Sequence, residues 1–307
     1  MSGDDAFELP AAFAVADAVS MRAQRLTKNL VRLELSLALV AGVLGLGRVM
    51  VKGHDALALG ATAAFVAVLV STLIRSLKDV ESAWYLGRAQ AESARTLAWR
   101  FAVGGDPFPA GTNEAESEED FLRRIQEVVD FMADRGLSAP ADADSRQLTD
   151  SLRSARRSAF EDRRTLYLNG RIDYQIRWYT DKAEAARRRQ NLWTVTACTA
   201  ATIGILAGLA RFVDATGTDL LGVMAAAFGA AIAWAQLNQF KTLTSSYAVA
   251  QQELILVRDR LLSTPSEKWA TFVSDSEDAI SREHSMWLAR RGHPSLQPRR
   301  QQGGSSA

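Results

Sequence analysis

The chain has 307 residues, 48% of them apolar, and its mean hydropathy is close to zero. That average hides a division, because long apolar runs flank a segment between residues 114 and 189 that is rich in Arg, Asp and Glu. A net charge of +1 argues against a nucleic-acid-binding protein, which needs a surplus of basic side chains. The single cysteine, Cys198, excludes an internal disulfide and a cysteine-based zinc site, and its apolar surroundings predict a small buried side chain.

Four apolar runs are long enough to cross a bilayer as helices, which takes about 20 mainly apolar residues each. They cover residues 33–51, 56–74, 192–210 and 220–237. Glu34 and Arg48 stand near the ends of the first run, where their side chains can reach the membrane interface. The last two runs are rich in Ala, Gly and Thr, so a buried soluble hairpin is the alternative for them. The sequence predicts an all-α integral membrane protein.

The short connections between the runs predict two antiparallel transmembrane hairpins, each continued by long cytoplasmic helical extensions. Basic residues near the run ends indicate the orientation, because Lys and Arg concentrate on the cytoplasmic side. Those at the open ends of the hairpins are Arg22, Arg25, Lys28, Arg32, Arg75, Lys78, Lys182, Arg187, Arg188, Arg189 and Lys241, whereas only Arg48, Lys52 and Arg211 lie at the closed ends. We expect a multi-pass protein of the cell inner (plasma) membrane with both termini in the cytoplasm.

The two hairpins superimpose at an offset of 161 residues, which pairs Lys28 with Arg189 and Gly47 with Gly208. Both halves share a segment with basic residues before the apolar runs, then two apolar runs, and then a polar helix. The predicted organisation is an N-terminal tail at 1–20, a first hairpin with its helical extension at 21–103, a linker with a short helix at 104–146, a second hairpin with flanking cytoplasmic helices at 147–291, and a disordered tail at 292–307.

Small residues four apart on the runs allow close helix contact in lipid, within one chain or between copies. The candidate helix-packing residues are Ala41 with Gly45, Gly60 with Ala64, Gly204 with Gly208, and Ala225 with Gly229.

Thr194 and Thr202 share one helix face, and with Gln236 they are candidate pore-lining residues. The alternative is that the threonine hydroxyls bond to their own backbone. Beyond the runs, aromatic and aliphatic residues at helical spacing predict a cytoplasmic bundle. Its candidate members are Trp84, Trp178, Trp269, Ile280 and Trp287.

The sequence contains no recognisable catalytic constellation. His54, His284 and His293 are scattered, and zinc-protease, phosphate-loop, nucleophile-elbow and paired-cysteine motifs are absent. We therefore expect neither an enzyme nor a bound cofactor or metal.

Three segments that flank the hairpins carry a recognisable pattern. They comprise Tyr167–Tyr179 with Lys182 and Ala183; Trp269, Phe272, Val273, Glu277, Ala279, Ile280, Glu283, His284, Trp287, Arg290 and Arg291; and Trp84, Tyr85, Arg88, Ala89, Glu92, Trp99 and Arg100. The pattern resembles the SLATT superfamily, the SMODS- and SLOG-associating two-transmembrane effector domains, present here as two fused copies.

This resemblance implies a bacterial membrane effector of a conflict or defence system. It would oligomerise and form a pore, or perturb the lipid bilayer, on a cytoplasmic signal, for which a nucleotide-linked signal is one candidate. Its partners would be further copies of the chain and a separate cytoplasmic sensor or nucleotide-signal synthase. The alternative is a non-conducting membrane scaffold or adaptor whose cytoplasmic bundle recruits a signalling partner.

Overall fold

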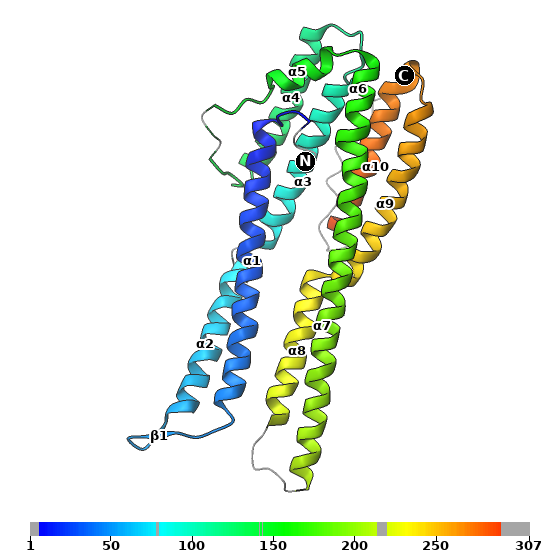
Figure 1. Ribbon diagram of the computed structural model, residues 1–307. Coiled ribbons are helices and arrows are strands. Elements are labelled where there is room, and N and C mark those ends of the chain that lie inside the picture. Colours follow the sequence, from blue (N-terminus) through cyan, green and yellow to red (C-terminus); the bar gives the residue numbers. More distant parts are fainter. Residues whose placement is uncertain (1–5, 78–79, 141, 143, 214–219, 290–307) are drawn as a thin grey trace, which may run out of the picture. The chain divides into compact units, whose positions relative to one another are not determined.

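The computed structural model describes residues 6–77, 80–140, 142, 144–213 and 220–289, with side chains described as far as Ser281 (Figure 1). Nearly all regular structure within these residues is helical, which confirms the all-α fold class. The elements are α1 (Ala11–Leu44), β1 (Met50–Val51), β2 (His54–Asp55), α2 (Ala56–Leu77), α3 (Val80–Val103), α4 (Glu114–Ala133), α5 (Asp150–Arg157), α6 (Phe160–Tyr167), a π-helix (Leu168–Asp173), α7 (Tyr174–Phe212), α8 (Leu220–Asn238), α9 (Phe240–Ser263), a 3₁₀ turn (Ser266–Lys268) and α10 (Trp269–Ala289). The predicted disordered tail at 292–307 lies outside the described residues.

The chain forms two compact units, and each is built from segments that are far apart in the sequence. The core unit comprises the described residues of Met1–Asp17, Tyr85–Tyr174 and Leu256–Ala307, and the span unit comprises Ala18–Trp84 and Gln175–Ile255. Along the chain, the boundaries between the units fall inside α1, α3 and α9 and at the start of α7. Neither unit coincides with one of the sequential segments inferred from the sequence.

The span unit contains two antiparallel helix pairs, α1 with α2 and α7 with α8 (Figure 1). In the first pair, the Ser71 hydroxyl on α2 donates a hydrogen bond of 3.1 Å to Glu34 on α1. In the second pair, Gly204 allows α7 to approach α8, since a Cβ at this position would lie 3.2 Å from the Cβ of Met224. A small apolar core of Val31, Trp234 and Phe240 joins α1 to the end of α8 and the start of α9.

Three described stretches are long and apolar enough to cross a membrane: Ala56–Leu77, which is α2; Phe160–Phe212, which runs from α6 to the end of α7; and Leu220–Ser263, which joins α8 to α9. They contain the second, third and fourth predicted spans. The first predicted span is not among them, because α1 has only about ten residues between Glu34 and its end, a rise of about 15 Å.

The predicted helical span over 33–51 is wrong at its C-terminal end. Helix α1 ends at Leu44, and Met50–Val51 pairs antiparallel with His54–Asp55 as a short β-hairpin. Lys52 and Gly53, at its tip, have φ angles of 49° and 83°, as a type I′ turn requires. Glycines follow the helix directly, and the valines after them favour an extended backbone, which explains the end of the helix.

The apolar helix that begins at Leu220 is also interrupted. Gln239, between α8 and α9, has a φ of 50°, which lies outside the right-handed helical region. Its backbone N–H donates to the carbonyl of Gln236 at 3.1 Å, so the chain makes a turn there before α9 begins. The predicted helical extension of the fourth span is therefore a separate helix, α9.

The core unit packs around aromatic side chains that include parts of the predicted tail and linker. Phe7, in the predicted N-terminal tail, is buried with its ring centroid 4.6 Å from that of Trp99. Helix α4, in the predicted linker, buries Phe121 at 4.8 Å from the ring of Phe101. Both segments bury apolar side chains, so they contribute to the core and do not serve only as connections.

Candidate functional site

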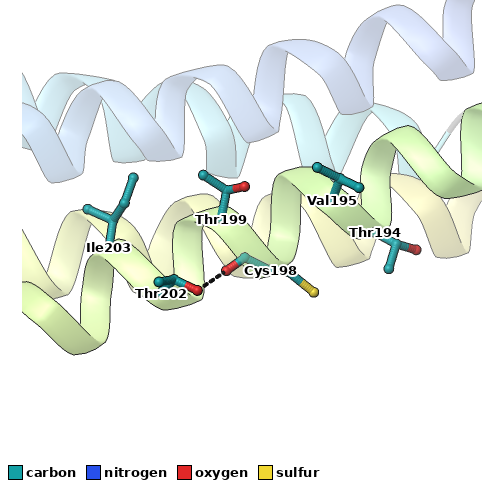
Figure 2. Close-up of a pocket in the computed structure, with 6 residues that line it drawn as sticks. All are labelled: Thr194, Val195, Cys198, Thr199, Thr202 and Ile203. Carbon is teal, nitrogen blue, oxygen red and sulfur yellow. Dashed lines mark hydrogen bonds between the residues drawn. The ribbon is translucent and has the colours of Figure 1, made fainter.

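The candidate pore-lining threonines lie on the outer face of α7. Thr194 and Thr202 are both exposed and line one side of an open groove of about 320 Å³, together with Val195, Cys198, Thr199 and Ile203 (Figure 2). Gln236, on α8, is also exposed. These side chains therefore do not enclose a channel within the described part of one chain.

The threonine hydroxyls on α7 bond within their own helix. The Thr202 hydroxyl donates to the carbonyl oxygen of Cys198 at 2.9 Å, and Thr196 donates to that of Leu192 at 2.9 Å (Figure 2 shows the former). Such bonds satisfy a hydroxyl in an apolar environment without a partner helix. The prediction that Cys198 is buried was wrong, because its face of α7 has no covering helix in the described chain.

The small-residue pairs divide into two groups. Ala41, Ala64 and Gly204 are buried, and Cβ atoms at Gly60 and Gly208 would lie 3.2 Å from Leu44 and 3.7 Å from Leu221. Gly45 follows α1, where the nearest atoms to an added Cβ are backbone oxygens at 3.5 Å.

Ala225 and Gly229 form the second group, on an exposed face of α8. A Cβ at Gly229 would meet no described atom within 4 Å. This face is therefore open in a single chain.

The five residues assigned to one cytoplasmic bundle occur in different surroundings. Trp269 and Ile280 are buried in the core unit, whereas Trp84 and Trp178 are half-buried in the span unit. Trp178 stacks edge-on against Tyr247, with the ring centroids 5.5 Å apart. Trp287 belongs to α10, but its side chain lies outside the described part of the structure.

A buried ionic network lies at the centre of the core unit. The Arg171 guanidinium donates to Glu277 through Nε at 2.9 Å and through Nη2 at 2.7 Å, and Nη2 also donates to Glu92 at 2.9 Å. The Tyr167 and Thr96 hydroxyls donate to the same Glu277 carboxylate at 3.1 and 3.0 Å. Glu277 is fully buried, so five polar groups satisfy one another out of contact with water.

The charges of this network keep Arg171 and Tyr167 protonated. Burial alone would lower the pKa of Arg171, but the negative charges of Glu277 and Glu92 raise it above its ordinary value. Burial, with the charge of Glu277, raises the pKa of Tyr167 well above its usual range. Arg95 lies 3.6 Å from Glu92, so two arginines compensate two carboxylates. The network is electrically balanced with Tyr167 neutral.

A π-helical turn positions Arg171. Residues Leu168–Asp173 form this turn between α6 and α7, and such turns are rare and often occur at functional sites. Gly170 lies within it, where an added Cβ would lie 2.8 Å from the Trp99 ring and 3.1 Å from Ala6. The missing side chain therefore allows α3 to lie against the turn.

The sequence alone does not identify this network as a site. Glu92, Tyr167, Arg171 and Glu277 all occur in the segments quoted for the family resemblance, but no role was assigned to them. Charged residues that are about 80 or more positions apart are each interpreted, one at a time, as part of a solvated helix face. Only the pattern of the family resemblance groups them.

Two family models match the chain in tandem. The SMODS and SLOG-associating 2TM effector domain 3 matches residues 10–164, and domain 1 of the same group matches residues 167–287. The chain belongs to the SLATT family. This confirms the resemblance seen in the sequence, two domain copies included. Neither a curated protein nor a solved structure matches the chain.

The two SLATT domains do not correspond to the two compact units. Glu92 and Thr96 belong to the first SLATT domain, whereas Tyr167, Arg171 and Glu277 belong to the second. All five lie in the core unit. The network therefore joins the two family domains inside one hydrophobic core, and with its apolar helices the chain is a membrane protein with SLATT effector domains.

Proposed function

We propose that this SLATT protein is a non-enzymatic membrane effector of a bacterial defence system. It oligomerises and opens a conduction path, or disrupts the bilayer, when a cytoplasmic signal acts on the core unit. The observation that carries the proposal is the uncovered surface of α7, where Thr194, Thr199 and Thr202 are among the residues that line an open groove. A pore needs several copies, each contributing such a face.

The proposed topology has four spans, with both termini and the core unit in the cytoplasm of a cell with an inner membrane. Helix α1 then crosses beside α2, and Glu34 enters the interface in an ion pair. Its carboxylate lies 3.5 Å from Arg75 Nε and also accepts the Ser71 hydrogen bond, which lowers the cost of burying the charge.

The proposed trigger acts through the core unit, because helices α1, α3 and α9 continue from it into the span unit along the chain. A separate sensor or nucleotide-signal synthase would supply the signal. The open face of α8 at Ala225 and Gly229 offers close approach for a second copy.

The test uses the full chain, expressed inducibly in bacteria with a membrane-potential dye and reconstituted in dye-loaded liposomes. Thr202→Val should change leakage if the face lines a pore. Thr62→Val is the matched control, because Thr62 is also exposed on a candidate span and also donates to its own helix, to Ala58 at 2.8 Å. Equal effects of both variants, or no leakage under any condition, would count against the pore.

The second candidate is a non-conducting scaffold that recruits a signalling partner. It is favoured by the threonine hydroxyls, which bond internally and need no water. A scaffold predicts undisturbed membrane potential in Thr202→Val and Gln236→Leu, together with undisturbed capture of the partner by the core unit. The liposome assay separates the two candidates. Only the effector depolarises the membrane by itself, whereas a scaffold would depend on the catalytic activity of its partner.

A further inference from the structure

Three cation–aromatic pairs and one further arginine form what we call the basic aromatic cluster of the span unit. The pairs, with distances from cation to ring centroid, are Lys28 with Trp84 at 5.6 Å, Arg32 with Trp234 at 5.1 Å, and Lys182 with Trp178 at 5.5 Å. The further residue is Arg189, whose charge acts on Lys28. Each pair joins a positive charge to an amphipathic ring.

The cluster lies where apolar helices become polar. Lys28 and Arg32 precede the apolar part of α1, Lys182 and Arg189 precede that of α7, and Trp234 is in the last turns of α8. Tryptophan and basic side chains concentrate at membrane surfaces, and basic pockets between spans bind lipid headgroups. The composition is therefore that of a bilayer interface.

The positive charges of the cluster have no carboxylate partner among the described residues. The neighbouring Glu34 pairs with Arg75, and Glu184 pairs with Arg188 at 2.9 Å. Burial lowers the pKa of Lys28, and the charges of Arg189, Arg32 and Lys182 lower it further. An anion placed among these side chains would relieve this repulsion.

We propose that the basic aromatic cluster binds the phosphate headgroup of an anionic phospholipid. The internal repeat supports a built site, because Lys28 and Arg189 are equivalent positions of the two hairpins and act on each other here. Trp234 favours a lipid over a soluble anion, since its ring in the last turns of α8 offers contact to the glycerol and acyl region. The inference rests on membrane insertion alone, so it holds for a conducting or a silent chain.

The test measures tryptophan quenching of the full chain in bilayers that mix brominated with ordinary lipid. Brominated phosphatidylglycerol should quench at a lower mole fraction than brominated phosphatidylcholine. Lys28→Gln with Arg189→Gln should reduce that preference by about fivefold per charge. Lys28→Arg with Arg189→Lys keeps both charges and should retain the preference, which separates charge loss from misfolding.

The matched control is Arg187→Gln with Arg188→Gln, which removes two positive charges from α7 next to Arg189 but outside the cluster. Equal losses in the two double variants would overturn the proposal in favour of diffuse surface charge. Absence of any preference in the unaltered chain would also overturn it. So would displacement of phosphatidylglycerol by millimolar inorganic pyrophosphate, because the cluster would then serve a soluble anion. The quenching experiment does not measure leakage. If the pore proposal fails, the result on lipid binding therefore still stands.

Discussion

At the scale of single residues, Arg171 has the most demanding environment in the described chain. It is 2% exposed and is shared between Glu92 and Glu277, which are also buried. Transferring three charges out of water is costly, and the attraction between them offsets this cost only while every partner is present. Truncation of one partner is therefore far more harmful than simultaneous neutralisation of all of them.

Arg171→Met should lower the free energy of unfolding by about 3–5 kcal/mol, because two buried carboxylates lose their shared partner. The triple variant Arg171→Met, Glu92→Gln, Glu277→Gln should recover a large part of this loss. Denaturant unfolding of the detergent-solubilised full chain, followed by the fluorescence of the core-unit tryptophans, measures both. A loss below about 1 kcal/mol in the single variant would contradict the assignment of a balanced buried network.

Tyr167 gives this network a dependence on alkaline pH. Burial and the charge of Glu277 raise its pKa in the folded chain well above 10.0, the ordinary value for a tyrosine. Below that value both folded and unfolded chains keep the proton; above it the unfolded chain loses the proton first, so stability falls as pH rises.

Tyr167→Phe should therefore be less stable than the unaltered chain near neutral pH, where the hydrogen bond to Glu277 is lost. Between about pH 9 and about pH 11 the difference should narrow, because the variant lacks this titration. Denaturant unfolding at both pH values checks the sign. A gap that widens with pH would show that Tyr167 ionises inside the folded core.

At the scale of elements, apolar length was sufficient to locate most of the membrane helices. The charge-free runs at 56–74 and 220–237 correspond to α2 and α8 within a few residues. The end of α1 was missed, because a continuous apolar run does not distinguish a helix from the strand at Met50–Val51. The π-helical turn was missed too, since its packing against Trp99 is a tertiary contact that local sequence does not encode.

Gly170→Ala tests the close approach at that turn. The new Cβ would lie 2.8 Å from the rigid Trp99 ring, so α3 or the turn must shift and stability should fall by about 1–3 kcal/mol. Gly229→Ala is the control, since a Cβ there meets nothing within 4 Å and alanine favours a helix. Gly170→Ala should have a clearly lower midpoint of thermal unfolding than Gly229→Ala. Equal midpoints would contradict the close contact between Gly170 and Trp99.

At the scale of the whole molecule, the tandem family domains share their cores. The first SLATT domain ends at residue 164, but the core unit takes segments from both domains. Phe101 and Trp99 come from the first domain, and Tyr167 and Trp269 come from the second, with Trp99 and Tyr167 at 5.9 Å between ring centroids. Neither domain can bury its aromatic face alone.

A chain cut between residues 164 and 167 tests this interdependence. The fragment 1–164 expressed alone should be digested rapidly by protease, because Trp99 and Glu92 lose their partners. Co-expression with the fragment 165–307 should restore a resistant complex that co-purifies. Independent resistance of both fragments would show that each family domain folds autonomously.

Because the two domains are covalently connected, assembly of the core unit does not depend on the concentration of the protein. When Glu92 and Arg171 belong to one chain, their encounter is intramolecular, and its effective concentration is set by the intervening chain, whatever the copy number in the cell. Folding of a two-chain equivalent would weaken as expression falls. The fused form keeps the core unit assembled even at a few copies per cell.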